Sequence, residues 1–264
     1  MPIRNEPWHT GTPCWVDLEA DDIPAACAFY ARLFGWSYEE APGDSGGYAF
    51  ALLDGRRAAG IGPRSEDAQG STAWMTYLAA DNADQVAAWI TAAGGIVIVP
   101  TFDVMEAGRM LVAADSAGAV FGVWQARGSI GAQVRGERGA LCWSELHTRD
   151  YAGVQGFYAR VFGYTYTTIS DTDDFRYTGF RPVGAEEDFG AVFEDNGSPV
   201  GIPNYWLPWF AVGDVDGVSG TAAGLGARSL MPPTDSAYGR MAVLAGPEGE
   251  PFGIIDPTMP PGTA

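Results

Sequence analysis

Hydrophobic and polar positions along the chain alternate between a strand-like and a helix-like period in a fixed order. Residues 14–19 alternate as a strand does, and Asp22 followed by Pro24 opens a helix with a capping residue and a proline in its first turn. Apolar residues continue at helical spacing as far as Gly35, a residue typical of helix ends. Strands are expected next at 36–40, 48–53 and 57–62. The predicted order of this first module is therefore βαβββ.

A second module of the same order follows directly. It begins with a strand at 73–79, and the polar pair Asp81-Asn82 opens a helix that extends to about Ala93. Three further strands are expected at 96–100, 109–113 and 119–124, with a hairpin turn at 115–118. The first half of the chain is thus predicted to hold two βαβββ modules.

The second half of the chain repeats the first. Cys14-Trp15 recurs as Cys142-Trp143, and the helix-end sequence F-Y-A-R-x-F-G recurs at the same offset of 128 residues. Such self-similarity over a long period indicates duplication. We therefore predict an α+β fold class with four βαβββ modules in two tandem domains, at residues 1–130 and 138–264. The Gly- and Arg-containing stretch between them has the composition of a surface connector.

The order of these modules, the repeated helix ends and the G-R-M…D-x-x-G-x-x-x-G close of the first half resemble a known family. They are similar to the tandem two-domain form of the vicinal oxygen chelate superfamily, of the glyoxalase/bleomycin-resistance/dioxygenase type. The resemblance implies that each pair of modules curls its sheet into a cup. It also implies that metal-using members place His, Gln or Glu ligands on the inner face of certain strands.

The positions that the family pattern assigns to those ligands hold other residue types here. Trp15, Trp74, Trp143 and Trp206 stand at the first-strand positions, and Gly122 and Gly253 stand on the closing strands. An indole nitrogen carries a hydrogen and has no lone pair for a metal, and glycine has no side chain. We therefore expect no metal, no cofactor, and neither glyoxalase nor extradiol dioxygenase chemistry. A metal held by residues near 57–62 or 189–194 is the alternative.

Strand side chains alternate between the two faces of a sheet, which predicts the residues that line each cup. We expect the first cup to present Trp15, Asp17 and Trp74, and the second Trp143, Glu145, His147, Trp206 and Phe210. Facing tryptophans could hold a planar polycyclic ligand, or they could simply fill a core. Arg176 and Tyr177 lie on a nearby strand and could donate hydrogen bonds to a quinone or carboxylate oxygen.

Glu145 and His147 are the candidate catalytic residues. They lie two positions apart on one strand face, where a carboxylate can raise the pKa of an imidazole and support proton transfer. The alternative is a histidine at the strand end that bonds only the backbone. The first half has Asp17 and Glu19 at these positions, so the second cup is favoured as the active one.

Composition excludes several classes of partner. The chain has 15 basic against 33 acidic residues, a formal charge of −18, which repels nucleic acid and anionic membranes. No apolar run is as long as a bilayer span, and the three cysteines form no spaced pair. These features, with an arginine-only basic set, favour a bacterial cytoplasmic protein. A monomer or a homodimer is expected, because the fused halves could satisfy internally the pairing that single-domain relatives achieve by dimerising.

Two functions are consistent with these patterns. The first is a metal-independent glyoxalase-like protein that binds a planar aromatic small molecule and uses proton transfer in the biosynthesis of a polyketide-type natural product. The second is a non-catalytic drug-binding protein of the bleomycin-resistance type.

Overall fold

The computed structural model describes residues 4–43, 46–65, 72–199 and 201–258. The first half contains β1 (Pro13–Ala20), α1 (Ile23–Phe34), β2 (Ser37–Glu40), β3 (Ala49–Leu53), β4 (Arg56–Pro63), β5 (Trp74–Ala79), α2 (Ala83–Ala92), β6 (Ile96–Val104), β7 (Gly108–Ala114) and β8 (Val120–Ala126). The second half contains β9 (Leu141–Thr148), α3 (Tyr151–Phe162), β10 (Thr165–Asp171), β11 (Arg176–Arg181), β12 (Gly190–Glu194), β13 (Tyr205–Ala211), α4 (Val215–Gly224), β14 (Arg228–Ser236), β15 (Gly239–Ala245) and β16 (Pro251–Asp256). No helix among these residues is long and apolar enough to cross a membrane.

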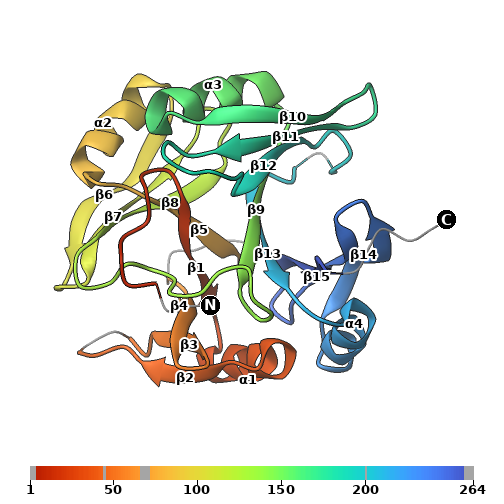
Figure 1. Cartoon of the computed structure of the whole chain (residues 1–264). Coiled ribbons are helices and arrows are strands. Elements are labelled where there is room, and N and C mark those ends of the chain that lie inside the picture. The colour runs from red at the N-terminus through yellow and green to blue at the C-terminus, as the bar shows by residue number, and fades with distance from the viewer. Residues whose placement is uncertain (1–3, 44–45, 66–71, 200, 259–264) are drawn as a thin grey trace.

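Each half forms one eight-stranded sheet, and the two sheets have the same strand order. The first runs β2-β3-β4-β1-β5-β8-β7-β6 and the second β10-β11-β12-β9-β13-β16-β15-β14. In each, the first strands of two modules pair antiparallel at the centre, as β1 with β5 and β9 with β13. The sheets curl into cups that open on opposite sides of the molecule (Figure 1). The predicted α+β fold of two tandem glyoxalase-like units is confirmed.

The helices begin and end for local reasons that the sequence predicts. Asp22 and Asp150 cap α1 and α3 by accepting hydrogen bonds from Ala25 N and Gly153 N. The next residue after each helix is a glycine with φ near +70°, the left-handed conformation that ends helices.

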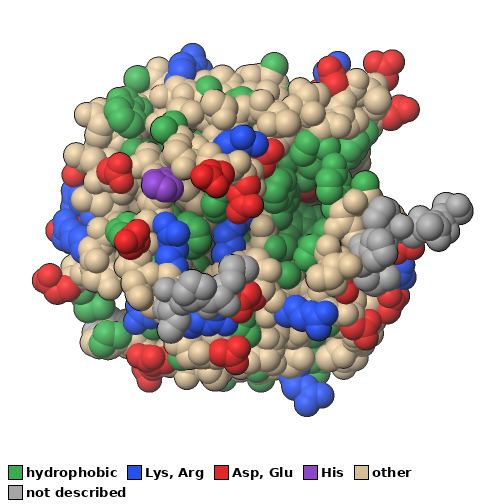
Figure 2. All heavy atoms as spheres, viewed as in Figure 1, with side chains coloured by type: hydrophobic (Ala, Val, Ile, Leu, Met, Phe, Trp, Pro, Cys, Tyr) green, Lys and Arg blue, Asp and Glu red, His purple; other side chains and the backbone are tan. Residues whose placement is uncertain are grey.

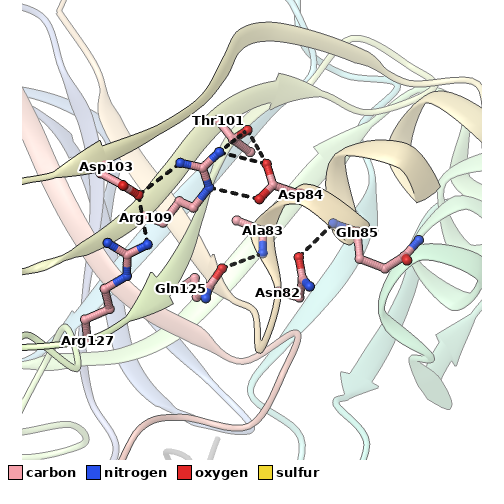
Figure 3. Close-up of polar contacts among 9 residues, drawn as sticks. All are labelled: Asn82, Ala83, Asp84, Gln85, Thr101, Asp103, Arg109, Gln125 and Arg127. Carbon is pink, nitrogen blue, oxygen red and sulfur yellow. Dashed lines mark hydrogen bonds and ion pairs between the residues drawn. The ribbon is translucent and has the colours of Figure 1, made fainter.

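The repeated Gly-Arg-Met sequence is a clamp on the second helix of each half. Arg109 pairs with Asp84 in the first turn of α2 and with Asp103 on β6, both at 2.9 Å (Figure 3). Arg240 makes the same pairs with Asp216 on α4 and Asp235 on β14. An acidic residue in the first turn also suits the positive end of the helix dipole. The motif therefore fixes the scaffold.

The main core lies between the convex faces of the two sheets. Helix α1 packs against α4 and α2 against α3, so each half buries its helices against the other half (Figure 1). Val16 and Leu18 of β1, for example, belong to the same cluster as Phe252 and Ile254 of β16. The two halves thus share one interior.

Two buried hydrogen-bonded chains cross this interior. The Trp74 indole donates to the Tyr30 hydroxyl (3.1 Å), which donates to Glu250 from the other half (2.8 Å). The repeat-related Trp206 indole donates to Tyr158 (3.1 Å), which donates to Asp115 of the first half (3.1 Å). Burial raises the pKa of both carboxyl groups. Each half therefore supplies the carboxyl group that a tyrosine of the other half binds.

The prediction that Trp74, Trp206 and Phe210 line the cups is wrong, because all three face this shared interior. The error lies in the helix start. The family pattern places the first-strand ligand seven residues before the helix cap, which is Trp74 if Asp81 is taken as the cap. The residue that caps α2 is Asn82, whose side chain accepts from Gln85 N (Figure 3). A one-residue slip on a strand exchanges the two faces of the sheet.

Candidate functional site

The concave face of the second sheet is an open hollow with an aromatic floor. Figure 2 shows it to the right of centre, as a depression where hydrophobic side chains gather. The strand register pairs Trp143 of β9 with Trp209 of β13, and His147 with Tyr205. Tyr177 of β11 pairs with Phe193 of β12. Directly opposite residues share a face, so these side chains form the wall and floor of one cup.

Three charged side chains form a chain in this cup. Glu145 Oε1 lies 2.7 Å from His147 Nε2, and Asp195 Oδ2 lies 3.0 Å from His147 Nδ1. All three side chains are only 11–12% exposed. Asp195 is itself held by the backbone N–H and hydroxyl of Ser198, at 2.9 and 2.7 Å. The imidazole ring therefore bridges two fixed carboxylates.

Both neighbours of the imidazole accept hydrogen bonds only, so the ring satisfies both when it is doubly protonated. Burial lowers the pKa of His147. Hydrogen bonds from the ring to Asp195 and Glu145, together with the attraction of their charges, raise it by more than burial lowers it, so that the pKa is about 9. The hydrogen bond with His147 likewise lowers the pKa of Asp195. The raised pKa makes His147 a cation at neutral pH, held between two carboxyl groups.

Aromatic rings hold the imidazole in place. Tyr205 stacks on it with ring centroids 4.6 Å apart, and Phe193 meets it edge-on at 5.1 Å. On the other side of the acid, the Tyr177 hydroxyl donates to Glu145 Oε2 (2.5 Å) and accepts from the Trp143 indole (2.9 Å). Burial is the main cause of the raised pKa of Tyr177, so it stays a phenol and a donor. We call Trp143, Tyr177, Glu145, His147 and Asp195 the second-cup relay.

We expect the relay to make stability depend on pH above neutrality. The folded pKa of His147 lies above its ordinary value of 6.5, so its contribution is complete below about pH 6.5 and is lost as pH rises through about 9. Urea unfolding of the native chain and of His147→Gln between pH 6 and 10 measures it. The stability difference between the two chains should shrink across that window, since other titrating groups cancel in the comparison. Parallel curves would contradict this assignment.

The second of the two candidate donors, Tyr177, faces the cup, whereas Arg176 does not. Arg176 is 43% exposed and pairs with Asp171 at 3.1 Å and with Glu194 at 3.5 Å. Because β11 alternates, only one of two consecutive residues can face the cup. Arg176 is thus an exposed residue at the start of β11, on the face of the strand that points away from the cup.

The first cup contains a related chain but is filled. Its Trp15 indole donates to the Tyr48 hydroxyl (3.0 Å), which donates to Asp17 (3.1 Å). Burial is the main cause that raises the pKa of Asp17 to about 7. No histidine follows, because Glu19 stands where the second half has His147. The Trp–Tyr–carboxylate element is therefore duplicated, and only the second copy extends to a cation.

The linker occupies the first cup. Its backbone bonds Cys14 through Ala132 and Arg57 through Gln133, each at 2.8 Å. Ala132 belongs to an apolar cluster with Trp15 and Tyr77. The composition of this stretch suggested a surface connector, but Ala132 is buried against the concave face and Val134 is buried in the shared interior. This difference between the cups supports the expectation that the second one is the functional one.

The residues on the cup floors do not fit a divalent metal. Seven residues before the true helix caps stand Trp15, Met75, Trp143 and Leu207. The closing-strand Gly122 and Gly253 lie under the rings of Tyr77 and Trp209. Glu145 and Asp195 bind opposite nitrogens of His147 and so do not converge on one point. Across the described ranges, no group of three or more His, Cys, Asp or Glu side chains is placed to hold a metal ion.

Asp195, Tyr205, Trp209 and Tyr48 complete these sites and were not predicted. Trp209 lies one residue before Phe210, which we placed in the cup, so the corrected helix cap would have identified it. Asp195 follows the last residue of β12, and the pairing of β12 with β9 brings it to His147. No local pattern in the sequence predicts the contact between Asp195 and His147.

The chain is similar to known proteins over nearly its full length. A sequence profile of the Glyoxalase/Bleomycin resistance protein/Dioxygenase superfamily matches residues 14–123. CFP32 from Mycobacterium tuberculosis, which is named as a glyoxylase, is 38% identical, with 97% of this chain and 98% of that protein covered. The anthracycline biosynthesis protein DnrV from Streptomyces peucetius is 32% identical, with 93% of each chain covered.

Solved structures agree in fold. The Mn(II)-bound glyoxalase from Novosphingobium aromaticivorans superposes with a TM-score of 0.65 at 18% identity, over 94% of this chain and 83% of that one. The 2,2',3-trihydroxybiphenyl 1,2-dioxygenase from Sphingomonas wittichii gives 0.62 at 16% identity, over 94% and 90% of the chains.

Proposed function

This chain belongs to the Glyoxalase/Bleomycin resistance protein/Dioxygenase superfamily, and within it we propose a metal-independent protein that binds a planar aromatic molecule in the second cup and transfers protons on it. The observation that carries this proposal is the second-cup relay, a hydrogen-bonded acid–cation–acid chain on an aromatic floor. The relative named for anthracycline biosynthesis supports a role with a polycyclic natural product, and we place that role in the cytoplasm.

The cup suits a flat, apolar ligand. Trp143 and Trp209 face one another across the central strand pair, and Tyr177 and Phe193 stand beside them. Large rigid rings contribute contact area with little loss of conformational entropy, and they prefer to stack on other rings. The polar groups are few and lie together at one place, as is usual in a small-molecule site.

The relay can move protons without a change in oxidation state. In a keto–enol exchange, Glu145 would accept the proton from the carbon beside a ligand carbonyl, and Tyr177 would donate one to the carbonyl oxygen. The proton on Glu145 would then pass along their shared hydrogen bond to the Tyr177 phenolate, while the His147 cation stabilises the carboxylate, so that one C–H bond breaks, one O–H bond forms and each side chain returns to its starting state. Such a step needs positioned acids and bases only.

The non-catalytic alternative rests on a specific observation. Both ring nitrogens of His147 and both oxygens of Glu145 already have partners at 2.5–3.0 Å. A cup whose polar groups satisfy one another can bind an aromatic drug and leave it unchanged. The two functions therefore differ in whether a ligand can replace one of the hydrogen bonds between the relay residues.

Hydrogen exchange on anthrone separates the two. Anthrone is a flat ketone with an acidic methylene group, and we expect the protein in D₂O to accelerate deuterium incorporation there, as followed by NMR. Glu145→Gln and Tyr177→Phe should each lower this rate about 100-fold or more. The matched change in the first cup, Tyr48→Phe, should leave the rate unaltered. Saturable binding without any acceleration would favour sequestration, and stoichiometric metal in the active protein would refute metal independence.

A further inference from the structure

One buried donor on the floor of the second cup has no partner. Trp209 is 4% exposed, yet its indole N–H makes no hydrogen bond with any described residue. The ring lies directly over Gly253, where a Cβ atom would come within 2.2 Å of it. Glycine at that position lets the indole lie flat on the closing strand.

The other buried indoles of the described chain all have acceptors. Trp15, Trp74, Trp143 and Trp206 donate to tyrosine hydroxyls, and Trp8, Trp36 and Trp124 donate to backbone carbonyls. The remaining tryptophan, Trp89, is 44% exposed and can donate to water. Buried polar groups are nearly always paired in native proteins, so an exception needs an explanation.

The duplication shows how the first half meets the same need. Tyr77 stands at the repeat-related position, over Gly122, and its hydroxyl shares Asp17 with Tyr48. In the second half, Leu207 separates Trp209 along β13 from the row of Tyr205 and His147, and the relay residues are already paired with one another. The donor at this floor position is satisfied within the protein in the filled cup and unsatisfied in the open one.

We infer that Trp209 donates its indole hydrogen to an oxygen atom of a ligand that displaces the protein atoms now enclosing the indole nitrogen, so that the second cup selects flat aromatics carrying a ring carbonyl or phenol oxygen over hydrocarbon analogues. This inference rests on the proposed function, since it assumes that an aromatic ligand occupies the cup. It adds a specificity-determining residue to the relay. The second-cup relay holds one side of the ligand, and Trp209 fixes the orientation of its oxygen.

The test uses two probes that differ only in ring oxygens, aminomethyl-anthraquinone and aminomethyl-anthracene. Their positive charge suits a chain with a formal charge of −18. Trp209→Phe keeps an aromatic ring and removes the N–H, so it should weaken anthraquinone binding about tenfold and leave anthracene binding within about twofold. Trp89→Phe is the matched control and should change neither.

A second measurement uses the intact protein. With ¹⁵N-labelled tryptophan, the indole N–H resonance that is missing in Trp209→Phe identifies Trp209. It should move downfield when the anthraquinone binds and stay in place with the anthracene. Equal losses for the two probes, or an unmoved resonance, would mean that Trp209 only packs or meets a water molecule, and would overturn the inference alone. If neither probe binds the native chain, both the proposed function and the inference that rests on it are refuted.

Discussion

Replacing His147 with Asn should lower the free energy of unfolding by about 3 kcal/mol or more at neutral pH, because it leaves two buried carboxylates without the cation between them. The Glu145 and Asp195 side chains are each only 11% exposed, so water cannot replace the lost partner fully. Urea unfolding followed by circular dichroism measures the change. Its size comes from the uncompensated charges more than from the loss of the ion pair itself.

A double variant tests that explanation. In His147→Asn with Glu145→Gln, one of the two stranded charges is removed, and a substantial part of the lost stability should return. At the first-cup position equivalent to His147, Glu19→Gln should change stability little, since no cation among the described residues pairs with it there. If the double variant is less stable than the single one, the destabilisation has a packing origin and the assigned charge state of His147 is wrong.

Replacing Trp206 with Ala should destabilise the protein by about 3–5 kcal/mol, the usual range for a large aromatic removed from a core. Tyr158→Phe is the finer version, since it removes the acceptor for the Trp206 indole and the donor to Asp115. We expect it to cost about 1–3 kcal/mol, because it leaves a buried acceptor unpaired. Thermal and urea unfolding give both numbers.

These variants also separate the shared interior from the cup. Neither change should alter ligand affinity beyond what partial unfolding explains, because Trp206 faces α3. Trp89→Ala on the exposed face of α2 provides the surface comparison and should be close to neutral. If the Trp206→Ala protein is stable but has lost its affinity for aromatic probes, Trp206 lines the cup and its assignment to the shared interior is wrong.

Most of the scaffold could be predicted from sequence because its signals are local. Capping residues such as Asp22, the helix-ending Gly35 and the alternation along each strand act within a few residues. Duplication then supplied the second half from the first. The one misplaced set of side chains came from taking Asp81 as the cap in place of its neighbour Asn82. Because a strand has a period of two, an error of a single residue inverted every assignment on β5 and β13.

Within the site, only the contacts between residues of one strand could be predicted from the sequence. Glu145 and His147 lie two residues apart on β9, so their proximity follows from strand geometry. Tyr177 and Asp195 come to them from β11 and from the end of β12, and those contacts depend on strand pairing and register. Sequence patterning contains no measure of that register. For the same reason, the charge state of His147 became clear only when its second carboxylate was found.

The crossed hydrogen-bonded chains of the interior limit how the two halves can change. Glu250 of the second half accepts the hydrogen bond from a tyrosine of the first half, and Asp115 of the first half accepts the one from a tyrosine of the second. Neither half therefore contains all the hydrogen-bond partners that its own core requires. A substitution at either carboxyl group is felt on the far side of the molecule. The cups face outward and share no such partner, which leaves each free to vary by itself. After the duplication, the two scaffolds can therefore change only together, whereas the residues of each cup can diverge separately. The difference between a filled first cup and an open second cup is a result of that divergence.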